Sequence, residues 1–260
     1  MISIPMRELN PGAVPEMLAL LGVCVDPGQT LPDMPLVERR IRAGQSLFFE
    51  GAPATSIYVV RAGTFKAFHT AEDGYEQVFG FARRGDLLGC DALSGDGHLM
   101  GTVALEDASV YVVALPDFYA LAQSLPAFHR GVMRAVSGAR VDLAQLADMM
   151  AAVASEVRLA RFLVHLSRRM STGGQPSTFL HLLMTRRDIG SYLGVAHETI
   201  SRSFAALAAL RLVKVNQREV EILDLAGLQG FAQGTRTPVK ASFGTAVAGL
   251  RPGRVLALAA

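Results

Sequence analysis

From Thr185 to Arg202 the chain reads TRRDIGSYLGVAHETISR, and this stretch decides how its C-terminal half folds. Thr185 is followed three residues later by Asp188, a pattern close to the capping box that starts a helix. Gly194 should end that helix, because a tight turn between two helices needs a residue that adopts positive φ. A helical hairpin is therefore predicted. The inner face of its first helix is formed by Ile189, Tyr192 and Leu193.

The second helix of this hairpin has two distinct faces. Its inward residues have the spacing of a buried helical stripe and are Ile200, Phe204, Leu207 and Leu210. Its outward residues gather in the first two turns, the part of a recognition helix that enters the major groove of DNA. Arginine can bond guanine in a bidentate fork, glutamate can accept from cytosine and serine can reach several base edges. We therefore predict a helix-turn-helix, with an ordinary helical hairpin bearing a charged outer face as the alternative. The predicted base-reading residues are His197, Glu198, Ser201 and Arg202.

Basic and hydroxyl side chains surround the predicted recognition helix. Leu212–Leu223 predicts two short strands about an Asn216–Arg218 turn, the wing of a winged helix. Ala196 stands where a Ser, Thr, Asp or Asn N-cap is preferred, which should cost the recognition helix roughly 1 kcal/mol. Asp224 is expected to cap a final short helix. The residues expected to bind DNA phosphates are Thr185, Arg186, Arg187, Thr199, Lys214 and Arg218.

The N-terminal half has a different pattern from about Val37 onward. Short apolar runs alternate with turn signals, which predicts an antiparallel β-sandwich or barrel. Asp73-Gly74 is the strongest hairpin signal. Before this region, Val14–Leu21 predicts one short helix. The predicted strands are Ser46–Phe49, Ser56–Val60, Thr64–His69, Glu76–Phe81, Leu87–Cys90, Met100–Leu105 and Ser109–Leu115.

Beyond Pro116 the apolar period becomes helical. Eight residues repeat at spacings of 4, 3, 4, 3, 4, 3 and 4, the a/d pattern of helices that pack at shallow angles. This pattern favours a two-stranded dimer helix, and a core helix lying against its own domain is the alternative. A second helix is expected over Glu156–Met170. The predicted dimer seam consists of Val132, Val136, Ala139, Leu143, Leu146, Met150, Val153 and Val157.

Charge and composition limit the class of protein. Residues 1–124 contain 8 Lys+Arg against 15 Asp+Glu, a net of −7, whereas residues 125–260 contain 17 against 8, a net of +9. The basic C-terminal half is the part expected to meet a polyanion. No apolar run approaches the roughly 20 residues of a membrane span, and the start does not resemble a secretory signal. A cytoplasmic protein with no membrane contact is therefore expected.

Several segments together resemble the CRP/FNR family of bacterial regulators, along nearly the full length to about residue 233. They are Gly51, IYVVRAG at 57–63, GDLLG at 85–89, ALED at 104–107, SRR at 167–169 and MTRRDIGSYLG at 184–194. Glu198–Arg202, which reads ETISR, is similar to the FNR branch, whose members bind TTGAT-type palindromes. The resemblance implies an α+β chain with an antiparallel double-stranded β-roll of the cyclic-nucleotide-binding kind, a long dimerisation helix and a C-terminal winged helix-turn-helix.

The resemblance also implies how the chain is divided and what it meets. Its implied partners are double-stranded DNA, a second copy of the chain and RNA polymerase. An activator is expected, but the sequence does not distinguish an activator from a repressor. The predicted divisions are a peripheral segment at 1–36, a β-roll sensor domain at 37–124, the dimerisation helix at 125–155, the winged domain at 156–233 and a flexible tail at 234–260.

No cofactor is predicted. The FNR cluster requires four cysteines, but this chain has only Cys24 and Cys90, and Tyr111 stands near the expected place of the fourth. The cyclic-nucleotide branch carries a Gly-Glu-Leu turn and a downstream Arg-Ser pair, whereas this chain has GCDAL at 89–93 and no such pair before the roll ends.

Three other interpretations stay open at this stage. The regulator could be gated by a small molecule or an anion, or by haem ligated by His69 or His98. A regulator without any signal is equally compatible with the residues. A cupin-like metal enzyme would need clustered histidines, and the six histidines include no His-x-His pair.

Overall fold

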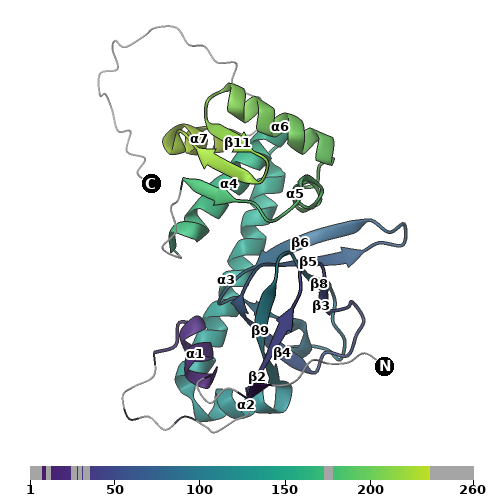
Figure 1. Cartoon of the computed structure of the whole chain (residues 1–260), viewed down its shortest axis with the longest axis vertical. Coiled ribbons are helices and arrows are strands. Elements are labelled where there is room, and N and C mark those ends of the chain that lie inside the picture. Colours follow the sequence, from purple (N-terminus) through teal and green to yellow (C-terminus); the bar gives the residue numbers. More distant parts are fainter. Residues whose placement is uncertain are drawn as a thin grey trace, which may run out of the picture.

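The chain forms a β-rich N-terminal part and a helical C-terminal part, connected by one long helix (Figure 1). The computed structural model describes residues 8–9, 13–24, 28, 31, 36–172 and 178–234. The predicted flexible tail, apart from Gly234, and much of the predicted N-terminal segment lie outside the described residues. Within the described ranges, no helix is long and apolar enough to span a membrane.

Two antiparallel sheets make the β-roll. Their strands are β1 (Glu8–Leu9), β2 (Val37–Ile41), β3 (Ser46–Phe48), β4 (Ser56–Ala62), β5 (Phe65–Thr70), β6 (Glu76–Ala82), β7 (Leu87–Leu88), β8 (Gly101–Ala104) and β9 (Ala108–Ala114). One sheet has the order β1-β2-β9-β4-β7 and the other β3-β8-β5-β6. Buried side chains from both sheets, including Leu47, Val60, Phe65 and Val110, form a common core. The predicted antiparallel roll is confirmed.

Local sequence explains most of these strands, and β1 and β2 are the exceptions. The Asp73-Gly74 hairpin connects β5 to β6, and Gly74 has φ of 81° as such a turn requires. Gly63 is needed between β4 and β5, because a Cβ there would lie 2.5 Å from the Cβ of Ala108. Strand β2 was not among the predicted strands. Its sequence VERRI contains three charged residues in five, which hides the alternation of a strand.

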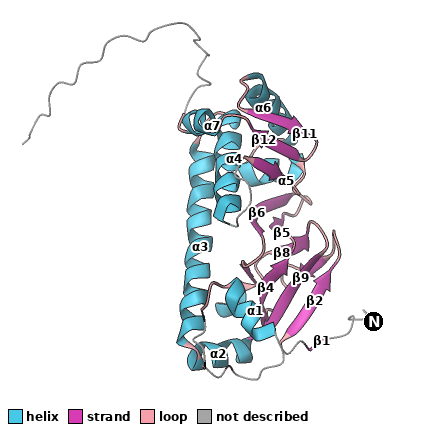
Figure 2. Ribbon diagram, turned by 60° about the vertical axis from the view of Figure 1, so that its left-hand side comes forward, coloured by secondary structure: helices cyan, strands magenta, loops and turns pink. Residues whose placement is uncertain are grey.

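Three helices support the roll: α1 (Ala13–Leu20), α2 (Leu115–Ser124) and α3 (Pro126–Ala151). The 26 residues of α3 correspond to about 39 Å, and Figure 2 shows it running from α2 beside the roll to the C-terminal part. The first turns of α3 pack in one buried cluster with α1 and α2. Its members include Met17, Leu18, Phe118, Leu121 and Phe128.

The prediction of one uninterrupted apolar seam is wrong at its C-terminal end. Helix α3 ends at Ala151, and Val157 belongs to a separate helix, α4 (Ser155–Thr172), where it is buried. Val132 and Leu146 are also buried within the chain. The alternative of a helix packed on its own domain therefore holds for these three residues. The five exposed members of the predicted seam are Val136, Ala139, Leu143, Met150 and Val153.

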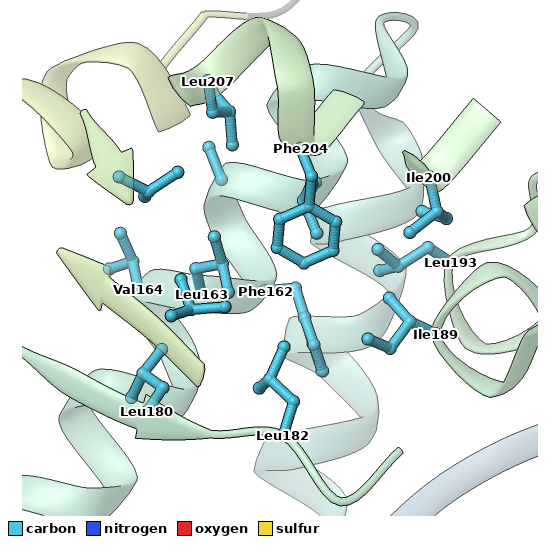
Figure 3. Close-up of a cluster of buried hydrophobic side chains, with 14 of the residues drawn as sticks. Phe162, Leu163, Val164, Leu180, Leu182, Ile189, Leu193, Ile200, Phe204 and Leu207 are labelled. Carbon is cyan, nitrogen blue, oxygen red and sulfur yellow. The ribbon is translucent and has the colours of Figure 1, made fainter. Parts of the chain in front are cut away.

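The C-terminal part is a winged helix-turn-helix built on α4. Its other elements are β10 (Phe179–His181), α5 (Arg186–Leu193), α6 (His197–Ala209), β11 (Val213–Asn216), β12 (Glu219–Ile222) and α7 (Leu225–Ala232). The three strands form a sheet in the order β10-β12-β11. In Figure 3, Phe204 and Leu207 of α6 lie over Phe162 and Leu163 of α4. The predicted wing is confirmed, and so is the Asp224 cap, whose carboxylate accepts from the amide of Gly227 at 2.8 Å.

Candidate DNA-binding surface

The corner between α5 and α6 forms from the local signals in its sequence. Thr185 Oγ1 accepts a hydrogen bond from the Asp188 amide at 3.1 Å, and Asp188 Oδ2 accepts one from the Thr185 amide at 2.9 Å. The capping box is thus complete. Gly194 ends α5 with φ of 65° and ψ of 39°, the left-handed conformation that glycine adopts without strain. These two devices fix where α6 begins.

The four predicted base-reading residues lie together on the exposed face of α6. His197 Nε2 is 3.2 Å from Glu198 Oε1, and the Ser201 hydroxyl donates to the His197 carbonyl at 3.2 Å. Arg202 donates to Thr199 Oγ1 at 3.2 Å. Such contacts between exposed groups contribute little to stability. They can be exchanged for base contacts at small cost.

The start of α6 lacks a side-chain cap. Ala196, the N-cap residue, has extended dihedrals (φ −63°, ψ 149°) and offers no side-chain acceptor to the first amides of the helix. The first amides of a helix have no partner within it, and its N-terminus attracts negative charge. A DNA phosphate would satisfy these amides in place of the missing cap.

The predicted phosphate-binding residues fall into two groups. Thr185 and Arg187, at the start of α5, are exposed, and so are Lys214 and Arg218 of the wing. Lys214 Nζ is 3.9 Å from Glu221, a long contact between two exposed groups that holds it weakly. These four side chains are accessible to a backbone that passes beside α6.

Arg186 and Thr199 have neighbours that the sequence does not reveal. The Arg186 guanidinium lies 3.8 Å from the ring centre of Phe204 and donates to the Gln217 carbonyl at 3.1 Å. Burial lowers the pKa of Arg186. This arginine therefore fastens α5 to α6 and to the wing turn. Thr199 is partly buried, and its hydroxyl oxygen accepts a hydrogen bond from the Arg202 guanidinium. This contact positions the Arg202 side chain.

Helix α5 is also fastened to the β-roll, through the free edge of strand β6. The Ser191 hydroxyl donates to the Glu76 carbonyl at 2.7 Å and accepts from the Val78 amide at 2.8 Å. Gln77 adds a hydrogen bond of 2.8 Å to the Ser191 carbonyl. Since β6 ends its sheet, these groups would otherwise be an open edge. The serine therefore satisfies two backbone groups of this edge and also docks the C-terminal part on the roll.

Lys66 of β5 provides a charged contact across the same junction. Its Nζ is 3.0 Å from Asp188 Oδ1 and 2.7 Å from Glu76 Oε2. Burial would lower the pKa of Lys66, but hydrogen bonds to Glu76 and Asp188 outweigh it and raise that pKa. Burial would likewise raise the pKa of Asp188, yet hydrogen bonds from Thr185 and Lys66 lower it. The carboxylate that caps α5 is thus shared between the two parts of the molecule.

Sequence reasoning missed Lys66 and Ser191 for a physical reason. The Lys66–Asp188 contact joins residues 122 positions apart, and the Ser191 contacts are similarly remote. No local spacing marks either residue, since a lysine in a strand and a serine in a helix are ordinarily solvated. Only the docking of α5 on β6 gives them partners.

The residues do not fit the iron–sulfur cluster that the family resemblance raises. Burial raises the pKa of Cys90 to about 11, so its thiol stays protonated, and Tyr111 is buried with its hydroxyl donating to Glu16 at 2.6 Å. Among the described residues, no three His, Cys, Asp or Glu side chains gather as a metal site requires.

Comparisons with known proteins agree with this architecture. Residues 38–124 match the model of the cyclic nucleotide-binding domain, and residues 157–231 match the Crp-like helix-turn-helix domain. The chain is 35% identical over 228 residues to "Transcriptional regulatory protein btr" of Bordetella pertussis, covering 85% of this chain and 94% of that protein. It is 32% identical over 238 residues to "Transcriptional activator protein anr" of Pseudomonas aeruginosa, covering 89% and 97%.

Solved structures show the same fold. FixK2 from Bradyrhizobium japonicum superposes with a TM-score of 0.68 at 25% identity, covering 76% of this chain and 97% of that one. A CRP/FNR-family transcriptional regulator from Thermus thermophilus gives a TM-score of 0.57 at 20% identity, covering 76% and 99%. The relatives are regulators and not enzymes, which removes the cupin-like alternative. This chain belongs to the CRP/FNR family of DNA-binding transcription regulators.

Proposed function

We propose that this regulator binds, as a homodimer, a two-fold symmetric DNA site with TTGA-like half-sites, and that it activates transcription there. The observation that carries the proposal is the exposed face of α6, where four side chains with base-reading chemistry share the first two turns. These turns are the part of a recognition helix that reaches base edges.

Each side chain of this face has a distinct proposed role. Arg202 forks onto a guanine, and Glu198 accepts from a cytosine of the complementary strand. Ser201 lies against a neighbouring thymine. His197 contacts a further base edge whose identity is open. Thr185, Arg187, Lys214 and Arg218 hold the backbone, and Arg186 and Thr199 support the two groups from within the fold.

The proposed homodimer rests on α3. Val136, Leu143 and Met150 are exposed and seven residues apart, so they lie along one face of the helix. Exposed apolar residues in a continuous stripe mark an interaction surface. A second copy of α3 would cover the stripe and relate the two α6 helices by a two-fold axis, as a palindromic site requires.

The proposed activation involves RNA polymerase as the partner. The Pseudomonas aeruginosa relative is named as a transcriptional activator, and this chain covers nearly all of that protein. We extend that role to this chain as part of the proposal.

Selection of bound sites from a random duplex library tests the proposal. The protein is purified both in air and anaerobically, and the Arg202→Ala variant is run beside wild type. Arg42→Ala, which removes an exposed arginine from the roll, is the matched control. We expect a two-fold site with TTGA-like half-sites for wild type and the control, and loss of one base preference in Arg202→Ala. Enrichment of an asymmetric site, or of none under both conditions, would refute the proposal.

A further inference from the structure

A large cavity lies at the junction of the β-roll and the DNA-binding part. Its volume is about 1030 Å³, at the upper end of the range for small-molecule sites. The walls come from α1, from the turns at the ends of β4 and β6, from α4, from the segment after β10 and from α5. Neither the Crp-like helix-turn-helix nor the cyclic-nucleotide-binding match assigns a ligand to this junction.

The apolar wall of the cavity contains three aromatic rings, one from the β-roll and two from the DNA-binding part. Tyr192 of α5 lies 5.2 Å from Phe81 of β6 and 5.6 Å from Phe162 of α4, measured between ring centres. Leu166 and Met170 of α4 extend this wall. Such a wall suits a flat apolar body.

Tyr192 also contributes a hydroxyl group that has no protein hydrogen-bond partner among the described residues. The residue is only 5% exposed and borders the cavity. Within the described ranges its hydroxyl makes no hydrogen bond, and since no buried side-chain oxygen there lacks a partner, the hydroxyl is open to the cavity. Burial raises the pKa of Tyr192 to about 12, so the hydroxyl is a donor at neutral pH.

Arg83 supplies a cation at the same cavity. Among the described residues its guanidinium has no hydrogen bond or ion pair, whereas the nearby Arg169 holds both Asp86 and Asp142, at 2.7 and 3.0 Å. Burial, followed by the neighbouring charge of Arg169, lowers the pKa of Arg83, and the charges of Asp86 and Asp142 offset this only in part. A half-buried cation without a hydrogen-bonded anion is destabilised. An incoming anion would relieve this.

The acidic side chains that line the cavity already have hydrogen-bond or ion-pair partners. Glu16 is paired with Arg61 at 3.1 Å, and Glu106 accepts from Thr64 at 3.0 Å. Arg83 also borders a second cavity of about 600 Å³, where Arg161 and Arg169 are paired with Asp148 and Asp142 and, among the described residues, no phenylalanine or tyrosine lines the walls. The larger cavity is therefore where an aromatic anion has the better site.

We propose that this cavity binds a small aromatic carboxylate, whose planar carboxylate is held by the guanidinium fork of Arg83 and the hydroxyl of Tyr192. The aromatic body lies against Phe81 and Phe162. An arginine fork matches a carboxylate in a bidentate geometry. The inference deepens the proposed regulatory function by naming a class of signal. Ligand binding itself does not depend on the proposed function, but the role of the ligand as a signal rests on it.

Calorimetric titration of the full-length protein with naphthoate, in the absence of DNA, tests the site. Naphthalenemethanol serves as the neutral analogue with the same body. We expect one naphthoate per chain and binding weakened about tenfold or more in Arg83→Gln, because hydrogen bonds to a charged group are lost. Tyr192→Phe should weaken binding several-fold while preserving the ring contacts. Arg42→Gln, which removes an exposed arginine outside the cavity, should bind as wild type does.

The outcomes separate clearly. Absence of naphthoate binding to wild type overturns the proposal, and so does equal binding by Arg83→Gln and Arg42→Gln. Equal affinity for the neutral analogue also overturns it, because the anion would then play no part. Thermal melting of each variant identifies a misfolded one, and Tyr192→Phe, which is nearly isosteric, keeps the test valid if Arg83→Gln fails to fold. No arm uses DNA, so failure here leaves the site-selection result intact.

Discussion

Arg202 and Arg187 are both exposed, but they are proposed to meet different parts of DNA. Arg202→Ala removes a base contact worth about 1–3 kcal/mol per half-site and should relax the preference at one position. Arg187→Ala should weaken binding to all sequences alike and reduce the salt dependence, because one fewer counterion is released per subunit. Binding titrations on matched and mismatched duplexes at several salt concentrations measure both effects. Identical patterns for the two variants would contradict the assignment.

Glu198 gives a sharper test of base reading. If this carboxylate accepts from a cytosine, Glu198→Ala should broaden the preferred site at that position. On a merely solvated face, removal of a negative charge near DNA would instead tighten binding to every sequence. Competition between the preferred duplex and single-base variants distinguishes the two results. An unchanged preference with higher overall affinity would show that Glu198 does not read a base.

At the residue scale, the features that could be predicted from the sequence are those set by residues close together in the chain. The Thr185–Asp188 cap and the positive φ of Gly194 were predictable because each depends on residues a few positions apart. The placement of Arg186 over Phe204 was not predictable, because it depends on how α5 packs against α6. The same holds for the unused hydroxyl of Tyr192. Its position in the inner stripe was predicted, but the cavity beside it was not.

At the scale of elements, α3 separates two leucines that look equivalent in the sequence. Leu143 is 58% exposed, whereas Leu146 is 7% exposed and belongs to the core shared with the DNA-binding part. Leu143→Glu should therefore give a folded monomer that has lost operator binding. Sedimentation with a thermal melt measures both properties. Persistence of the dimer in Leu143→Glu would refute the proposal that this stripe of α3 forms the dimer interface.

Leu146 is the matched comparison. Leu146→Ala should lower the free energy of unfolding by about 2–5 kcal/mol, since it leaves a cavity in a packed core. Its effect on assembly should be secondary. Urea unfolding of both variants separates the two roles, and equal stability losses would mean that the two residues share one environment.

Elements were predictable where their pattern was clean. Strands between glycine turns could be predicted because the turns mark where each strand begins and ends. Strand β2 could not, because the three charged residues of VERRI obscure the alternation of apolar and polar residues. The end of α3 was missed because the 4-3 spacing continues through Val153 and Val157, although the backbone breaks after Ala151. An apolar period shows which residues share a face, but it does not show where a helix stops.

At the scale of the whole molecule, the Lys66–Asp188 pair couples the roll to the winged domain. Asp188 has a lowered folded pKa, so its contribution to stability is present above about pH 4 and is lost as the pH falls through the folded value. Lys66 has a raised pKa, so its contribution is present below about pH 10 and is lost as the pH rises through the folded value. Between these limits the pair should be constant.

A double-mutant cycle of Lys66→Met and Asp188→Asn, followed by urea unfolding at pH 5 and pH 9, measures this coupling. We expect a coupling energy of about 0.5–3 kcal/mol that is the same at both pH values. A large difference between them would mean that another titrating group controls the junction. The contact is therefore a structural fastening and not a physiological pH switch.

Because Ser191 pairs with the edge of strand β6, truncation of the chain before the winged domain should affect the roll. A fragment that ends before α4 would leave the Glu76 carbonyl and the Val78 amide unpaired on a bare edge, next to the already exposed ring of Phe79. Unprotected edges of this kind recruit further strands and lead to aggregation. The truncated roll should accordingly scatter light at concentrations where the intact chain stays clear. The winged domain thus covers a strand edge of the roll that would otherwise promote association between copies.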